Sequence, residues 1–166
     1  MKKCYLITSL ACLILFACDE SKIKPETNFI KAKVNGVEMV FNVFPEEQLN
    51  YIAIGRNYLA ITLRKDVESS EYWAITVSNV DIDKIKLPFT IEGPNHNYSG
   101  KFPEFFTTIY DPNGGPYGKS IAGANTHNSN ISVTLTSFDG EVIKGTFEGS
   151  DFSNGEFQMK LQRLKL

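Results

Sequence analysis

Alternation of apolar and polar side chains with a period of two residues recurs along this chain and constrains its fold more than any other feature. In segment 131–136, every odd position is Ile, Val or Leu and every even position is Ser or Thr. The same alternation appears in segments 30–34, 59–64, 72–77 and 157–161. Because successive side chains of a β-strand point to opposite faces, each segment predicts a strand with one buried face.

Three dipeptides that favour tight turns separate these segments, namely Asn35-Gly36, Asp139-Gly140 and Asn154-Gly155. They tolerate the positive φ angles of short hairpin connections, so we expect a hairpin at each of them. Many short strands with single apolar faces predict an all-β domain. We favour an antiparallel β-sandwich, and the alternative is a squat β-barrel.

The N-terminal segment has the pattern of a bacterial lipoprotein signal peptide. Two lysines follow the first residue, residues 5–16 are predominantly apolar, and a small residue precedes Cys18. This run suits a secretory signal and is shorter than the about 20 apolar residues of a spanning helix. We therefore expect removal of residues 1–17 and lipid attachment to the Cys18 sulfur. The alternatives are attachment at Cys12 and an ordinary secretory signal in which Cys18 is incidental.

The lipid anchor and the charge balance limit the partners of the mature chain. Residues 18–27 are polar and predict a flexible tether, which leaves 28–166 as a single antiparallel β domain. Acyl chains on Cys18 would hold the domain at a membrane surface. Loss of two signal lysines lowers Lys plus Arg from 17 to 15 against 19 acidic residues, which argues against nucleic acid as a partner. No cysteine follows Cys18, so the domain has no disulfide and no cysteine-bound metal.

The lipoprotein signal and four segments, Ile30–Gly36, Ile131–Phe138, Ile143–Phe147 and Asn154–Phe157, resemble small uncharacterised cell-envelope lipoproteins of Bacteroidota. The resemblance covers both ends of the domain, about a third of the mature chain. It implies an all-β envelope domain and brings no activity with it.

The resemblance also bears on location, through the acidic residues that directly follow Cys18. In that group such a stretch, here Asp19-Glu20, resembles an export signal to the cell surface. The implied location is the outer membrane, with the domain on the cell surface, and the alternative is the periplasmic face. In enteric bacteria, Asp after the lipid-bearing cysteine would instead indicate retention in the inner membrane.

Residues 93–130 differ in composition from the rest of the chain and are the candidate ligand-binding region. They hold half of the 12 glycines, four of the 7 prolines and both histidines, with aromatic residues between them. Aromatic rings stack on the apolar faces of sugars, and Asn and Asp bind hydroxyl groups. The candidate residues are Tyr98, Tyr110, Asp111, Asn113, Tyr117 and His127. The simpler interpretation, which we favour, is that 105–110 is another strand and that the glycines and prolines form turns.

The sequence contains no compact catalytic or metal-binding motif. His96, Asp111 and His127 would form a metal or acid–base site only if their loops converged. Segment 111–115 begins like a calcium loop, but Ala122 stands at the twelfth position, where a bidentate Glu is needed. We expect no cofactor, no metal and no enzyme activity. The weaker alternative is a hydrolase that uses a catalytic pair among the 19 acidic residues.

Two functions are compatible with these features. The first is a membrane-anchored, non-catalytic lipoprotein whose surface binds glycan or another envelope or host ligand. The second is a structural or accessory subunit that docks on an envelope protein complex.

Overall fold

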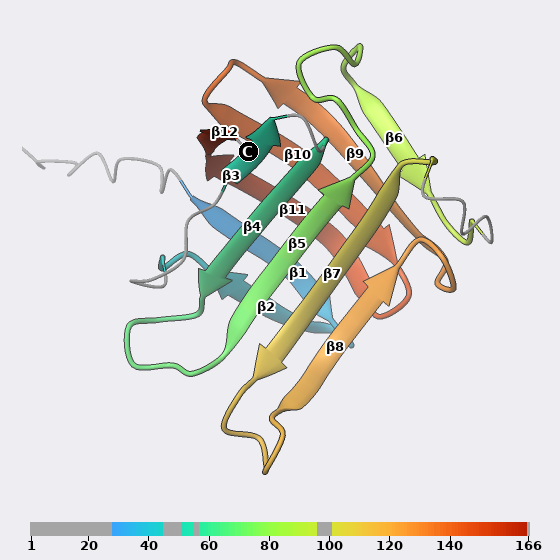
Figure 1. The fold of residues 1–166 in the computed structure, drawn as a ribbon. Helices are drawn as coiled ribbons and strands as arrows, with labels where there is room; N and C mark the ends of the chain where they lie inside the picture. Colours follow the sequence, from blue (N-terminus) through green and yellow to red (C-terminus); the bar gives the residue numbers. More distant parts are fainter. Residues whose placement is uncertain (1–27, 45–50, 55–56, 96–100, 166) are drawn as a thin grey trace, which may run out of the picture.

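The computed structural model describes residues 28–44, 51–54, 57–95 and 101–165, which form β-strands in two layers and no helix (Figure 1). In spatial order, sheet A contains β2 (Val37–Phe41), β1 (Phe29–Val34), β11 (Phe152–Lys160), β10 (Val142–Gly149), β9 (Ile131–Phe138) and β6 (Phe89–Glu92). Sheet B contains β12 (Gln162–Lys165), β3 (Tyr51–Ile54), β4 (Tyr58–Arg64), β5 (Tyr72–Ser78), β7 (Glu104–Asp111) and β8 (Lys119–Asn125). The two sheets pack face to face, which confirms the β-sandwich and excludes the barrel.

Two of the places where the chain passes from one sheet to the other are near Val43 and at Leu161. The N–H of Val43, just after β2, donates to the Arg64 carbonyl at 3.1 Å, and the N–H of Arg64 donates back at 2.7 Å. At Leu161 the chain leaves β11 and enters β12, which runs parallel to β3. Every other pair of described strands is antiparallel, so this edge is the one departure from the predicted arrangement.

The predicted alternation is confirmed, because every second side chain of the central strands is buried between the sheets. In β9, for example, Ile131, Val133 and Leu135 are buried. The Trp73 ring of sheet B lies 5.4 Å from Phe41 and 5.8 Å from Phe147 of sheet A, edge-on in both cases. Each such side chain contributes about 1.5–3 kcal/mol by burial. An aromatic cluster therefore joins the two layers.

Two of the three predicted turns connect strands as expected. Asn35 and Gly36 form a two-residue turn between β1 and β2, with φ angles of 49° and 82°. Asp139 and Gly140 begin the connection between β9 and β10. The Asp139 carboxylate accepts the N–H of Val142 at 2.7 Å there, which closes the turn.

The predicted turn at Asn154-Gly155 is wrong, because both residues lie inside β11 and the chain reverses at 150–151. Asn154 has a φ of 53° and forms a β-bulge, where the register with both neighbouring strands shifts. A Cβ at position 155 would lie 2.7 Å from the Phe147 ring, so only glycine fits there. Asn154 adopts the positive φ that a tight turn also requires, but it does so within a strand.

The N-terminal predictions lie outside the described residues. They comprise the signal peptide, Cys18 and the tether. Among the residues that the structure describes, no helix is long and apolar enough to cross a membrane.

Candidate functional site

The candidate site is the face of sheet B that points away from sheet A. It lies toward the viewer in Figure 1 and presents side chains in rows across β4, β5, β7 and β8. Strand register aligns Tyr58, Ser78 and Glu104 in the first row. The second row contains Ala60, Thr76, Phe106 and Asn125, the third contains Thr62, Ala74, Thr108 and Gly123, and the fourth contains Arg64, Tyr72, Tyr110 and Ser120. These four rows are called the outer face below.

Large side chains stand toward both ends of the outer face, and small ones occupy its middle. The third row contains only threonine, alanine and glycine. Tyr72 and Tyr110 follow at one end, and Tyr58 and Phe106 stand toward the other. Because strand side chains project perpendicular to the sheet, the middle of the face forms a floor lower than its two ends.

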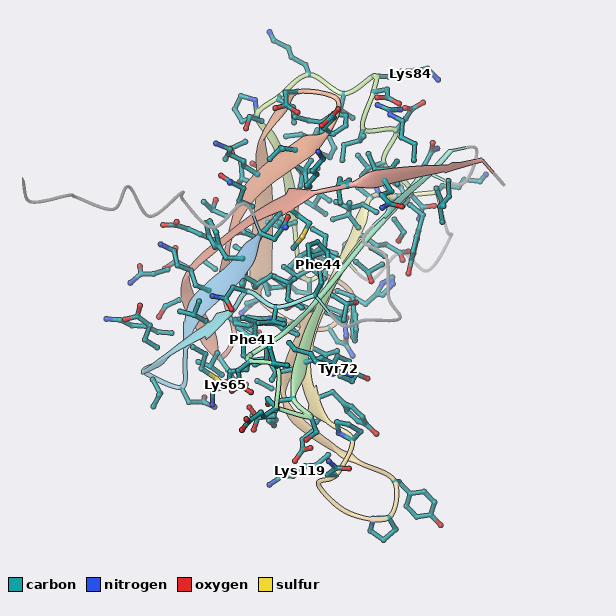
Figure 2. All side chains as sticks on the ribbon, turned by 90° about the vertical axis from the view of Figure 1, so that its left-hand side faces the viewer. Phe41, Phe44, Lys65, Tyr72, Lys84 and Lys119 are labelled. Carbon is teal, nitrogen blue, oxygen red and sulfur yellow. The ribbon has the colours of Figure 1, made fainter. Side chains whose placement is uncertain are left out.

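A hollow of about 330 Å³ opens at the Tyr72 end, within the size range of small-molecule sites. It is called the hairpin-end hollow and is lined by Arg64, Val67, Glu68, Ser69, Ser70, Tyr72 and Pro112. The Tyr72 ring lies 5.4 Å from the Tyr110 ring, tilted by 47°. Figure 2 places Tyr72 with Lys65 and Lys119 toward the lower end of the molecule and Lys84 at the opposite end.

The chemistry of this hollow combines an aromatic surface with hydrogen-bonding groups of both kinds. The Tyr72 hydroxyl can donate a hydrogen bond, and burial, with Tyr110 as the second cause, raises its pKa above the ordinary value. The Arg64 guanidinium adds donors, and the Glu68 carboxylate adds acceptors. Such a lining can bind a ligand that has both an apolar face and several hydroxyl groups.

Two chain connections are held together to form the walls of the hairpin-end hollow. In the connection between β4 and β5, Asp66 Oδ1 accepts the backbone N–H groups of Glu68 at 3.0 Å and Ser69 at 2.6 Å. Ser70 Oγ then donates to Asp111 Oδ1 at 2.8 Å, which joins this connection to the β7–β8 hairpin. Residues far apart in the sequence are thereby fixed beside Tyr72.

Four of the predicted ligand-binding residues come together at the β7–β8 hairpin. The Tyr110 hydroxyl donates to the Tyr117 carbonyl at 2.5 Å, and Asp111 Oδ1 accepts the N–H of Asn113 at 2.9 Å. The Tyr117 side chain is 93% exposed. Tyr110 and Asp111 therefore hold the hairpin in place, and Asn113 and Tyr117 lie at its tip. The preferred interpretation of 105–110 as a strand is confirmed, since these residues belong to β7.

His127 is not part of this group, because it lies beyond the opposite end of β8. The seven residues of β8 span ~20 Å. His127 Nε2 lies 3.4 Å from Glu104 Oε1, beside a second hollow of about 430 Å³. It is called the far hollow and is lined by Tyr58, Thr76, Ser78, Glu104, Phe105, Phe106, Asn125 and His127.

The structure also separates two members of the hypothetical metal or acid–base site, since Asp111 and His127 lie at opposite ends of β7 and β8. His96 and Tyr98 lie outside the described residues. Within the described ranges, no three His, Cys, Asp or Glu side chains are close enough to share a metal ion.

Sequence reasoning missed Arg64, Ser70 and Tyr72, which line the hairpin-end hollow. The alternation around Trp73 does indicate that Tyr72 faces outward. The approach of Ser70 to Asp111 had no such signal, because it depends on how the β4–β5 and β7–β8 connections meet in space.

A third hollow of about 430 Å³ lies beside β3 and the segment that follows β5. Its charged groups are paired with one another or with β12. Lys84 Nζ donates to Asp81 Oδ2 at 2.6 Å, and Arg163 donates to both carboxylate oxygens of Asp83 at 2.7 and 2.6 Å. The Arg163 hydrogen bonds hold the pKa of Asp83 below its ordinary value. These ion pairs make the third hollow a weaker ligand site than the hairpin-end hollow.

Comparison with protein-family models, curated proteins and solved structures found no match to this chain. The outer face and its two hollows are therefore the observations from which its function is inferred.

Proposed function

We propose that this protein is a lipid-anchored, non-catalytic binding protein of the bacterial cell envelope, and that its ligand is a glycan held at the outer face of sheet B. The observation that carries the proposal is the pair of tyrosine rings, Tyr72 and Tyr110, beside the polar lining of the hairpin-end hollow. A sugar ring has apolar C–H faces and a rim of hydroxyl groups. It would stack on Tyr72 and bond to Arg64, Glu68 and Ser70.

A glycan array tests this proposal directly. The full-length protein in detergent micelles is applied to immobilised glycans, and the affinity for any hit is measured in solution. Tyr72→Ala removes the stacking surface and should weaken binding about tenfold or more. Val37→Ala, at an exposed position on the edge of sheet A, is the matched control and should bind as the original chain does. Absence of any hit, or equal binding by Tyr72→Ala, would refute the glycan site.

We propose that the domain stands on the outer surface of the cell, because Asp19-Glu20 directly follow Cys18 in the sequence. Treatment of intact cells with protease, with lysed cells as the positive control, tests this. Cleavage in intact cells would support an extracellular ligand. Protection in intact cells combined with cleavage after lysis would place the domain on the periplasmic side of the outer membrane.

A second candidate function is docking on an envelope protein complex. The strand β2 favours it, because β1 is its one partner among the described strands and because Val37 and Val40 are 66% and 38% exposed. An open strand edge can accept a strand from a partner. Crosslinking in cells from a photoreactive residue at position 38 would capture that partner, and the same probe at position 146 of sheet A serves as the control.

A further inference from the structure

We infer that the ligand is an extended, uncharged polymer that lies along the strands of the outer face and occupies both the hairpin-end hollow and the far hollow. This inference rests on the proposed function and extends it, since it specifies the length and the charge of the glycan. It is carried by the continuity of the outer face, by the lining of the far hollow and by the distribution of charge.

The two hollows belong to one surface, because both are lined by residues of the same four rows. Arg64 and Tyr72 of the fourth row line the hairpin-end hollow. Tyr58 of the first row and Phe106 of the second line the far hollow. On β4, Tyr58 and Arg64 are six residues apart, which corresponds to ~20 Å along the strand. A disaccharide cannot reach from one hollow to the other, whereas a chain of several sugar units can.

The floor between the hollows is low enough to let a polymer pass. The third row spans four strands with Thr62, Ala74, Thr108 and Gly123 and includes no side chain larger than threonine. Gly123 has no side chain, and an added Cβ would have ordinary contact distances there, with no atom closer than 3.5 Å. Threonine hydroxyl groups in this row add polar atoms along the path.

The far hollow repeats the chemistry of the hairpin-end hollow. Phe106 is 43% exposed and offers an aromatic surface, as Tyr72 does at the other end. Glu104 provides a carboxylate that is held in place by two neighbours. Ser78 Oγ donates to its Oε2 at 3.4 Å, and His127 Nε2 lies 3.4 Å from its Oε1. Each hollow therefore combines an aromatic ring with oriented polar groups.

The charge distribution favours an uncharged ligand. The second and third rows contain no ionisable side chain, and Arg64 and Glu104 stand at opposite ends of the outer face. A polyanion would meet no cations along the middle of the path and a carboxylate at its end. A neutral polysaccharide meets aromatic rings in both hollows and threonine hydroxyl groups between them.

A chain-length series tests this inference. The probes are neutral gluco-, xylo-, manno- and galacto-oligosaccharides, each as a disaccharide and as a hexasaccharide, with full-length protein in detergent micelles. In the series that binds, the hexasaccharide should bind about tenfold or more tightly than the disaccharide, because it fills both hollows. Phe106→Ala should abolish this length advantage, because the far hollow loses its aromatic surface. Tyr72→Ala should weaken both ligands.

A second variant tests the path itself. Ala74→Phe places a large ring in the middle of the third row, where a strand accepts an aromatic residue readily. It should remove the length advantage as Phe106→Ala does. Thr146→Phe, on the exposed face of sheet A, is the matched control and should retain the advantage.

The outcomes separate the two proposals. Equal binding of disaccharide and hexasaccharide, or a length advantage that persists in both Phe106→Ala and Ala74→Phe, would overturn the extended ligand and leave the glycan site standing. Failure of every oligosaccharide and of the glycan array would overturn both proposals.

Discussion

The Trp73 indole N–H donates to Thr107 Oγ1 at 2.7 Å, and both residues are fully buried. Trp73 lies on β5 and Thr107 on β7, the neighbouring strand of sheet B. This bond satisfies the polar atom of the largest side chain in the core. It also allows a threonine to occupy an inward position where the neighbouring strands have aliphatic residues.

Thr107→Val should destabilise the protein by about 1–3 kcal/mol, because it keeps the shape of the side chain but leaves the indole N–H without an acceptor. Urea unfolding followed by Trp73 fluorescence measures the loss. Thr146→Val, at an exposed position in β10, is the control and should change stability by about 0.5 kcal/mol or less. Equal stability of the two variants would contradict a role for the bond.

Gly155→Ala should destabilise the protein by about 1–3 kcal/mol through overpacking against the Phe147 ring. Gly123→Ala is the matched control, since the added methyl group has ordinary contact distances there. Thermal unfolding distinguishes the two. If Gly155→Ala and Gly123→Ala had the same melting temperature, the bulge in β11 would accommodate the methyl group without loss of stability.

Tyr110→Phe should loosen the β7–β8 hairpin, because the hydroxyl that donates to the Tyr117 carbonyl is lost. Faster hydrogen exchange at residues 112–118 would report this, with a loss of about 0.5–1.5 kcal/mol of local stability. Tyr117→Phe keeps the carbonyl acceptor and should leave exchange unchanged. Equal exchange in both variants would show that the hairpin holds its shape without the Tyr110 hydroxyl.

The ion pair between Asp83 and Arg163 should contribute stability that depends on pH. Because Arg163 lowers the pKa of Asp83 from the ordinary value of 3.8, the contribution is present above that value and is lost as the pH falls through the lower pKa of the folded state. The pair is exposed, so it is worth about 1 kcal/mol or less. Urea unfolding at pH 7 and below pH ~3 measures how much stability the protein loses in acid. Asp83→Asn should remove the part of that loss that comes from this ion pair. Glu148→Gln, in β10, should retain it.

Local patterns predicted the fold well, because burial of alternate residues is encoded within each strand. The inward positions of β9 follow directly from the alternation in 131–136. The turn at Asn154-Gly155 was mispredicted, since a bulge and a turn require the same positive φ. Only the partner strands decide between them.

The candidate site was predicted only in part, because it depends on contacts between distant segments. Tyr110, Asp111, Asn113 and Tyr117 are close in sequence and meet at one hairpin. Ser70 donates a hydrogen bond to Asp111, 41 positions later in the sequence, and no local sequence pattern predicts that contact. His127 belongs to the same compositionally distinct segment, 93–130, but it lies at the other end of the sheet.

The position of β1 in sheet A has a consequence for how the protein is made. Its inner neighbour is β11, and the side chain of Asn28 accepts the N–H of Lys160, 132 residues later. A chain exported from its N-terminus delivers β1 first and β11 among the last strands. On the proposed export route, the first strand would therefore wait, with its β11 edge unpaired, until nearly the whole domain has crossed the inner membrane, and export machinery or chaperones would have to protect that edge in the meantime.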